Sequence, residues 1–98
     1  MPTWLDALQS WYQMQSDGEW EHQYGIKIET LDNPGWAVEV DLAATNLSGK
    51  SLPEMTAERS ETDWFRCSVE AGRFKGFGGP TNLAEILEVF LGWAEAEQ

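Results

Sequence analysis

The chain has 98 residues and carries 17 Asp or Glu against six Lys or Arg, a formal net charge of −11 at pH 7. This length suits one domain, residues 1–98, with a single hydrophobic core. Its 42% apolar content, with six Trp and four Phe, excludes a disordered chain. The negative field repels nucleic acid and anionic lipid and attracts a basic protein partner.

The acidic residues also dominate both ends of the sequence. Residues 1–26 and residues 76–98 contain no Lys or Arg.

No apolar run is long enough to span a bilayer, and the first residues lack the basic and apolar regions of a signal peptide. The single cysteine, Cys67, cannot form an internal disulfide. We therefore expect a cytoplasmic protein.

A first helix is predicted from Thr3 to about Gln15 or Ser16. Thr3 is a good N-cap, and Asp6 follows at capping-box spacing. Apolar residues then recur at helical spacing, which predicts an aromatic face that packs against a sheet: Leu5, Leu8, Trp11 and Tyr12.

A β-hairpin is predicted next. Tyr24, Ile26 and Ile28 alternate with polar residues or glycine, so a strand runs to about Leu31. The sequence Asp32-Asn33-Pro34-Gly35 predicts a type II turn in which Gly35 takes a positive φ. The return strand has one apolar face, formed by Trp36, Val38, Val40 and Leu42.

Residues 46–62 are predicted to form a loop, because Ser, Gly, Pro and charged residues interrupt any periodicity. A third strand covers residues 63–70, with Phe65, Cys67 and Val69 on one face. A tight turn at Ala71-Gly72 leads to a fourth strand, residues 73–77, whose basic and glycine-rich sequence suits a sheet edge.

A second helix follows the fourth strand. Asn82 and Glu85 have capping-box spacing, and apolar residues recur at three and four positions from Leu83 onward. The predicted fold class is therefore α+β, in the order αββββα. Its four strands form an antiparallel meander, and the N- and C-terminal helices pack on one face, because a sheet with one apolar face needs one covering layer.

Five polar residues are candidates for a metal site or an acid/base site: Asp17, Glu19, Glu21, His22 and Asp32. Carboxylates with a histidine suit a divalent metal ion or an acid/base pair. The segment nevertheless lacks the glycine-punctuated loop of an EF-hand and a second histidine. We expect no catalytic residue, no metal and no cofactor, and a small metal-dependent or acid/base enzyme stays as an alternative. Cys67 lies on the same face of the predicted strand as Phe65 and Val69, which predicts a buried, structural thiol.

A binding surface is the preferred interpretation. Three tryptophans, Trp20, Trp36 and Trp64, provide more aromatic surface than a core of this size needs, and partly exposed tryptophan often anchors interfaces. Together with nearby acidic residues they form a candidate surface for a basic protein partner. The candidate partner-binding residues are Asp17, Glu19, Trp20, Glu21, His22, Asp32, Trp36 and Trp64.

Four segments in this order, DGEWEH, YGIKIETLDNPGW, DWFRCSVE and LAEILEVFLGW, resemble the bacterial immunity protein 53 family. The resemblance covers nearly the whole chain except residues 46–62. The matching residues are Asp17, Trp20, Glu21, His22, Gly25, Asp32, Asn33, Pro34, Gly35 and Trp36. The resemblance implies a non-enzymatic protein that protects a cell from its own polymorphic toxin by binding the toxin.

The expected partner is thus a cognate toxin domain of basic charge, with no nucleic acid and no membrane as partners. The protein itself is expected to be a monomer or a homodimer. A homodimeric regulatory or structural module stays as a further alternative.

Overall fold

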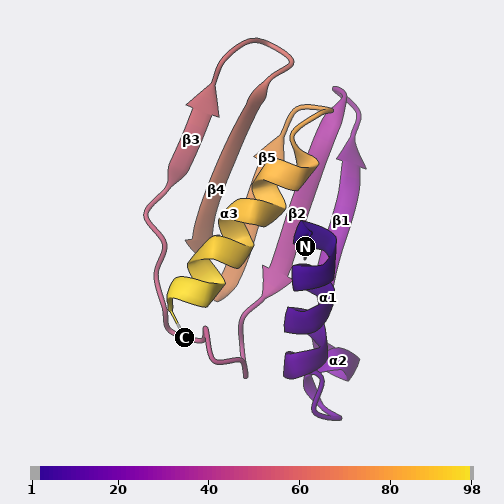
Figure 1. Ribbon diagram of the computed structural model, residues 1–98, viewed down its shortest axis with the longest axis vertical. Coiled ribbons are helices and arrows are strands. Elements are labelled where there is room, and N and C mark those ends of the chain that lie inside the picture. Colours follow the sequence, from indigo (N-terminus) through magenta and orange to yellow (C-terminus); the bar gives the residue numbers. More distant parts are fainter. Residues whose placement is uncertain (1–2, 98) are drawn as a thin grey trace.

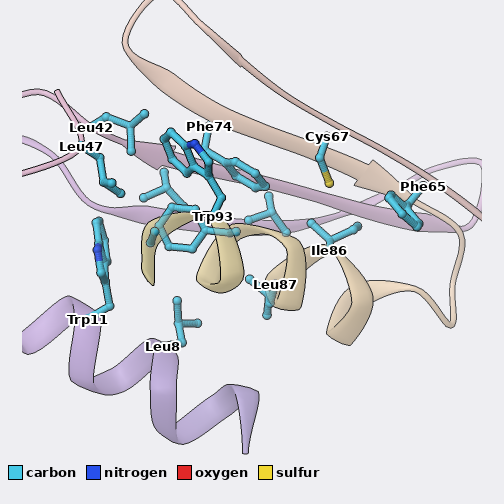
Figure 2. Close-up of a cluster of buried hydrophobic side chains, with 14 of the residues drawn as sticks. Leu8, Trp11, Leu42, Leu47, Phe65, Cys67, Phe74, Ile86, Leu87 and Trp93 are labelled. Carbon is cyan, nitrogen blue, oxygen red and sulfur yellow. The ribbon is translucent and has the colours of Figure 1, made fainter. Parts of the chain in front are cut away.

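The computed structural model describes residues 3–97, apart from the side chains of Glu21 and Gln23. Within these residues, three helices and five strands follow one another: α1 (Trp4–Gln15), α2 (Trp20–Gln23), β1 (Ile26–Leu31), β2 (Gly35–Asp41), β3 (Met55–Glu58), β4 (Trp64–Glu70), β5 (Arg73–Gly78) and α3 (Leu83–Ala96). The strands form one antiparallel sheet in the order β1-β2-β5-β4-β3. Figures 1 and 2 show α1 and α3 on the same side of this sheet, as predicted.

The first helix begins as its sequence predicts. The Thr3 hydroxyl accepts a hydrogen bond from the Asp6 N–H at 3.3 Å, and the Asp6 carboxylate accepts one from the Thr3 N–H at 3.4 Å. This reciprocal pair is a capping box, which satisfies two backbone donors at the helix start. Leu8 and Trp11 are buried on the inner face of the helix.

The predicted meander is wrong in strand order and strand number. A fifth strand, β3, lies within the predicted loop and pairs with β4 at the edge of the sheet. The chain then returns through β4, and β5 lies in the centre, between β2 and β4. The glycine-rich strand is therefore the middle of the sheet and not its edge.

Helix packing explains the glycines of β5. A Cβ atom at Gly76 would collide with the Ile86 side chain, and a Cβ atom at Gly78 would lie 2.9 Å from Ile86 Cδ1. Both glycines thus leave space for α3, which packs across β2, β4 and β5. Glycine in a strand interior often marks such a close approach.

The hairpin between β1 and β2 forms with the predicted strands but with a different turn. Gly35 does not take a positive φ, so the predicted type II turn is wrong. Asp32, Asn33 and Pro34 form the connection, and Gly35 pairs with Leu31 as the first residue of β2. A Cβ atom at Gly35 would collide with the Gly78 carbonyl oxygen. Glycine is needed here because the backbone of the neighbouring strand comes close.

Replacing Gly35 with alanine is expected to destabilise the protein by about 1–3 kcal/mol, because the added methyl group meets backbone that cannot move independently. Urea denaturation followed by circular dichroism measures this change. Gly92 provides a matched control, since it lies in α3 with nothing within 4 Å of an added Cβ. Gly92→Ala is expected to stabilise the helix by about 0.5–1 kcal/mol. Equal stability of the two variants would contradict the close approach at Gly35.

The core lies between the sheet and α3 and extends to α1. Figure 2 shows Ile86 of α3 near Cys67 of the sheet, and Leu87 pointing towards Leu8 of α1. The Phe90 ring contacts the Trp11 and Phe74 rings, with centroids 5.0 Å apart in each case. Cys67 is fully buried, as predicted, and burial raises the pKa of its thiol to about 12.

The capping box predicted for α3 does not form. Asn82 precedes the helix, but its side chain makes no hydrogen bond to the first helical turn's backbone. It bonds instead to two carboxylates and to the backbone of β4, in a network described below. No helix among residues 3–97 is long and apolar enough to cross a membrane.

Candidate partner-binding site

The fold places the predicted partner-binding residues at two opposite ends of the molecule. Asp17, Glu19, Trp20 and His22 lie in or beside α2, at the bottom of Figure 1. Asp32, Trp36 and Trp64 belong to the other end, where the β1–β2 turn and the loop before β4 lie. The side chain of Glu21 lies outside the described residues.

At the α2 end, two of the candidate residues build the local structure. The Asp17 carboxylate accepts hydrogen bonds from the Glu19 and Trp20 N–H groups, each at 3.0 Å, and these bonds lower the pKa of Asp17. Asp17 thereby satisfies backbone donors at the start of α2.

Trp20 is not the exposed anchor that its sequence context predicts. Its side chain is only 1% exposed, and its Nε1–H donates to the Asp41 carbonyl oxygen at 3.3 Å. The indole packs edge-on against Trp11 and Tyr12, with centroids 5.7 Å apart in each case. A partner cannot reach this ring in the folded protein. Glu19 and His22 at this end stay exposed.

Asp32 lies far from the other described residues suggested for metal or acid/base chemistry, Asp17, Glu19 and His22. Asp32 is separated from α2 by the six residues of β1, a span of roughly 20 Å for an extended strand. Among the residues that the structure describes, no group of three or more His, Cys, Asp or Glu is placed to hold a metal ion.

The other end of the molecule carries a set of adjoining hollows. The largest, which we call the turn-end hollow, has a volume of about 490 Å³ and is lined by Asn33, Pro34, Glu61, Thr62, Trp64 and Pro80. A second hollow of about 240 Å³ shares Pro34 and Pro80 with it and is lined also by Trp36. A third, of about 330 Å³, shares Glu61 and Trp64 and extends to Glu58. Both Trp36 and Trp64 are half-buried here.

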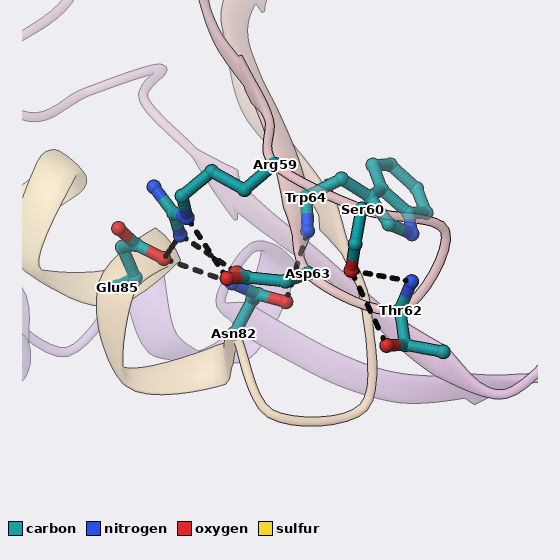
Figure 3. A network of polar contacts seen from close by, with 7 residues as sticks. All are labelled: Arg59, Ser60, Thr62, Asp63, Trp64, Asn82 and Glu85. Carbon is teal, nitrogen blue, oxygen red and sulfur yellow. Dashed lines mark hydrogen bonds and ion pairs between the residues drawn. The ribbon is translucent and has the colours of Figure 1, made fainter.

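A polar network fixes the loop before β4 to the start of α3 (Figure 3). The Arg59 guanidinium donates to both carboxylate oxygens of Asp63, at 2.8 and 3.0 Å, and to Glu85 at 2.6 Å. The Asn82 amide donates to the same two carboxylates, at 2.9 and 2.8 Å. These bonds lower the pKa of Asp63 to about 2 and lower that of Glu85, because Arg59 stabilises both carboxylates in their charged form.

The same network holds Trp64. The Asn82 side-chain oxygen accepts a hydrogen bond from the Trp64 N–H at 3.3 Å, and the Trp64 carbonyl accepts one from the Gly79 N–H at 3.0 Å. Figure 3 shows the Trp64 indole pointing away from the network. The backbone is thus fixed while the ring stays partly accessible.

Trp36 is fixed in a similar way. Its Nε1–H donates to the Pro80 carbonyl oxygen at 3.0 Å, which connects β2 to the loop that precedes α3. A Cβ atom at Gly79 in that loop would collide with the Thr62 carbonyl oxygen. Three loops therefore meet closely around the hollows, and hydrogen bonds fix the Trp36 indole and the Trp64 backbone there.

Sequence patterns identify this site only in part. They predict Asp32, Trp36 and Trp64 as site residues, but Arg59 and Glu61 lie in the segment predicted to be a loop. The spacing of Glu85 from Asn82 predicts a capping box, but the Glu85 carboxylate instead accepts hydrogen bonds from the Arg59 and Asn82 side chains. No local pattern indicates that Arg59 and Glu85, far apart in sequence, come into contact.

In a comparison with protein-family models, the model for Immunity protein 53 matches residues 5–95. No curated protein and no solved structure matches the chain.

Proposed function

Because the chain belongs to the immunity protein 53 family, we propose that it neutralises a cognate toxin of a bacterial polymorphic toxin system by binding the toxin directly in the cytoplasm. It catalyses no reaction and needs no cofactor in this role. The contact surface is the end of the molecule that carries Trp36, Trp64 and the turn-end hollow.

The observation that supports this surface most is that two half-buried tryptophans lie around the hollows, with the Trp36 indole and the Trp64 backbone each held by hydrogen bonds. Trp36 is fixed through Pro80, and Trp64 is fixed through Asn82 and Gly79. Large aromatic side chains beside a pocket are typical anchors of protein interfaces. A surface that is already ordered loses little conformational entropy on binding, and this favours high affinity.

The charge of the protein suits a basic toxin. The net charge of −11 accelerates association with a positively charged partner. Asp17, Glu19 and Glu21, at the far end from the hollow, contribute to this long-range attraction without contacting the toxin. Asp32 lies in the β1–β2 turn and places a carboxylate near the proposed interface.

Replacing Trp64 with alanine is expected to weaken toxin binding by about 30-fold or more, which corresponds to at least about 2 kcal/mol. The change should appear mainly in the dissociation rate, because the anchor acts after encounter. Surface plasmon resonance with the cognate toxin domain measures both rates.

Tyr24 provides a matched control, because it is an aromatic residue of 39% exposure near the opposite, α2 end. Tyr24→Ala is expected to bind within about threefold of the wild type. A large loss for Tyr24→Ala together with wild-type binding for Trp64→Ala would place the interface at the α2 end.

A further inference from the structure

We infer that the Trp64 indole and the carboxylates of Glu58 and Glu61 form a receptor for a basic side chain, arginine or lysine, of the bound toxin. This inference rests on the proposed function and specifies the chemistry that the toxin presents to the turn-end hollow.

Trp64 stands between two hollows that are bordered by carboxylates. Glu61 lines both the turn-end hollow and the adjoining one of about 330 Å³, and Glu58 lines the latter. Glu58 is also paired with Trp64 across β3 and β4, so the two side chains project from the same face of the sheet. The indole is therefore flanked by two negative charges.

These two charges are available for a partner. Glu58 and Glu61 are exposed, and neither forms an ion pair in the part of the chain that the structure describes. Of the nearby bases, Arg59 is already bound by Asp63 and Glu85 and therefore does not neutralise the carboxylates beside Trp64. Arg66 lies on the same face of β4 as Trp64, and among the described residues it forms no ion pair with Glu58 or Glu61.

An aromatic face next to unpaired carboxylates is suited to a guanidinium or ammonium group. The cation is attracted to the ring face of tryptophan, the strongest of the aromatic side chains in this respect. Arginine can in addition bind a carboxylate through two parallel hydrogen bonds while its plane stacks on the ring. A neutral apolar side chain would use the ring but leave both carboxylates without a partner.

The test uses a small probe and does not require the toxin. The wild-type protein, labelled with ¹⁵N, is titrated with N-acetyl-arginine methylamide and, separately, with the citrulline analogue, which has the same shape without the charge. The indole N–H resonance of Trp64 is assigned from its absence in Trp64→Phe. We expect a saturable shift of this resonance with the arginine probe and none with the citrulline probe.

Two double variants show whether the effect is local. In Glu58→Gln/Glu61→Gln the shift is expected to decrease at least about fivefold. In Glu88→Gln/Glu95→Gln, which removes the same charge from α3, the shift is expected to persist. Equal shifts with both probes, equal shifts in both double variants, or no shift of Trp64 would each overturn the inference.

Toxin binding separates this inference from the proposed function. If the wild type binds the toxin but Glu58→Gln/Glu61→Gln binds it as tightly as Glu88→Gln/Glu95→Gln does, the inference is wrong and the proposed function stands. If the wild type does not bind the toxin at all, the proposed function is wrong, whatever the probe shows.

Discussion

Replacing Trp20 with alanine is expected to destabilise the protein by about 3–5 kcal/mol, the usual effect of removing a large aromatic side chain from a core. The indole is 1% exposed, contacts the Trp11 and Tyr12 rings, and donates a hydrogen bond to Asp41. Its loss would leave a cavity beneath α2 and an unpaired carbonyl group. Urea denaturation followed by far-ultraviolet circular dichroism measures the free energy of unfolding.

Trp20→Phe is the matched variant for this prediction. It keeps an aromatic ring in the core and loses the hydrogen bond to Asp41 with part of the volume, so we expect a smaller loss of about 1–2 kcal/mol. Once folded, the phenylalanine variant should bind the toxin as the wild type does. A Trp20→Ala protein as stable as the wild type would show that α2 does not pack on the core.

Replacing Asn82 with alanine is the second large effect, an expected loss of about 2–3 kcal/mol. Asn82 is 2% exposed and donates to Asp63 and Glu85 while it accepts from the Trp64 N–H. Alanine would leave the Trp64 N–H without this acceptor and remove the link between β4 and α3. Chemical denaturation gives the stability, and surface plasmon resonance gives the effect on toxin binding.

The neighbouring Thr81 is exposed and serves as the control for Asn82. Thr81→Ala is expected to change stability by no more than about 0.5 kcal/mol. The affinity of Asn82→Ala for the toxin, corrected for the fraction of protein that is unfolded, should also be lower than that of the wild type. The reason is that Trp64 would be less firmly positioned. Wild-type stability of Asn82→Ala would show that the network does not hold the two elements together.

Elements defined by local patterns were predictable from the sequence. The capping box at Thr3 and Asp6 and the alternation of Trp36, Val38 and Val40 depend on neighbours along the chain, and both correspond to elements of the structure. The inward face of β4, with Phe65 and Cys67 buried, follows from the same alternation. In such cases the residues that determine the element lie within it.

Features defined by distant contacts were not predictable. The glycines of β5 suggested a sheet edge, yet they lie under Ile86 of α3. Gly35 suggested a turn of positive φ, yet its role is to make room for the Gly78 backbone. In both positions the reason for glycine is a neighbour that is remote in the sequence.

In the candidate site too, some features follow from local sequence and others depend on contacts between distant residues. The composition pointed to tryptophans with acidic neighbours, and Trp36 and Trp64 do line hollows. Trp20, in an equally acidic segment, is buried, because burial depends on what α1 and the sheet place around the ring. The network of Arg59, Asp63, Asn82 and Glu85 joins two segments that no periodicity relates.

The central place of β5 also affects how the protein is made on the ribosome. The β1–β2 hairpin can close as soon as its own residues emerge, but the other edge of β2 pairs with Arg73–Gly78. At bacterial and other cellular rates of about 5–20 residues per second, roughly 2–7 s pass between the synthesis of Asp41 and that of Gly78. During this interval the nascent chain presents an unpaired strand edge with Val38 and Val40 beside it, and unpaired edges of this kind recruit other strands. A chaperone that covers this edge during the interval would therefore prevent its pairing with strands of other chains.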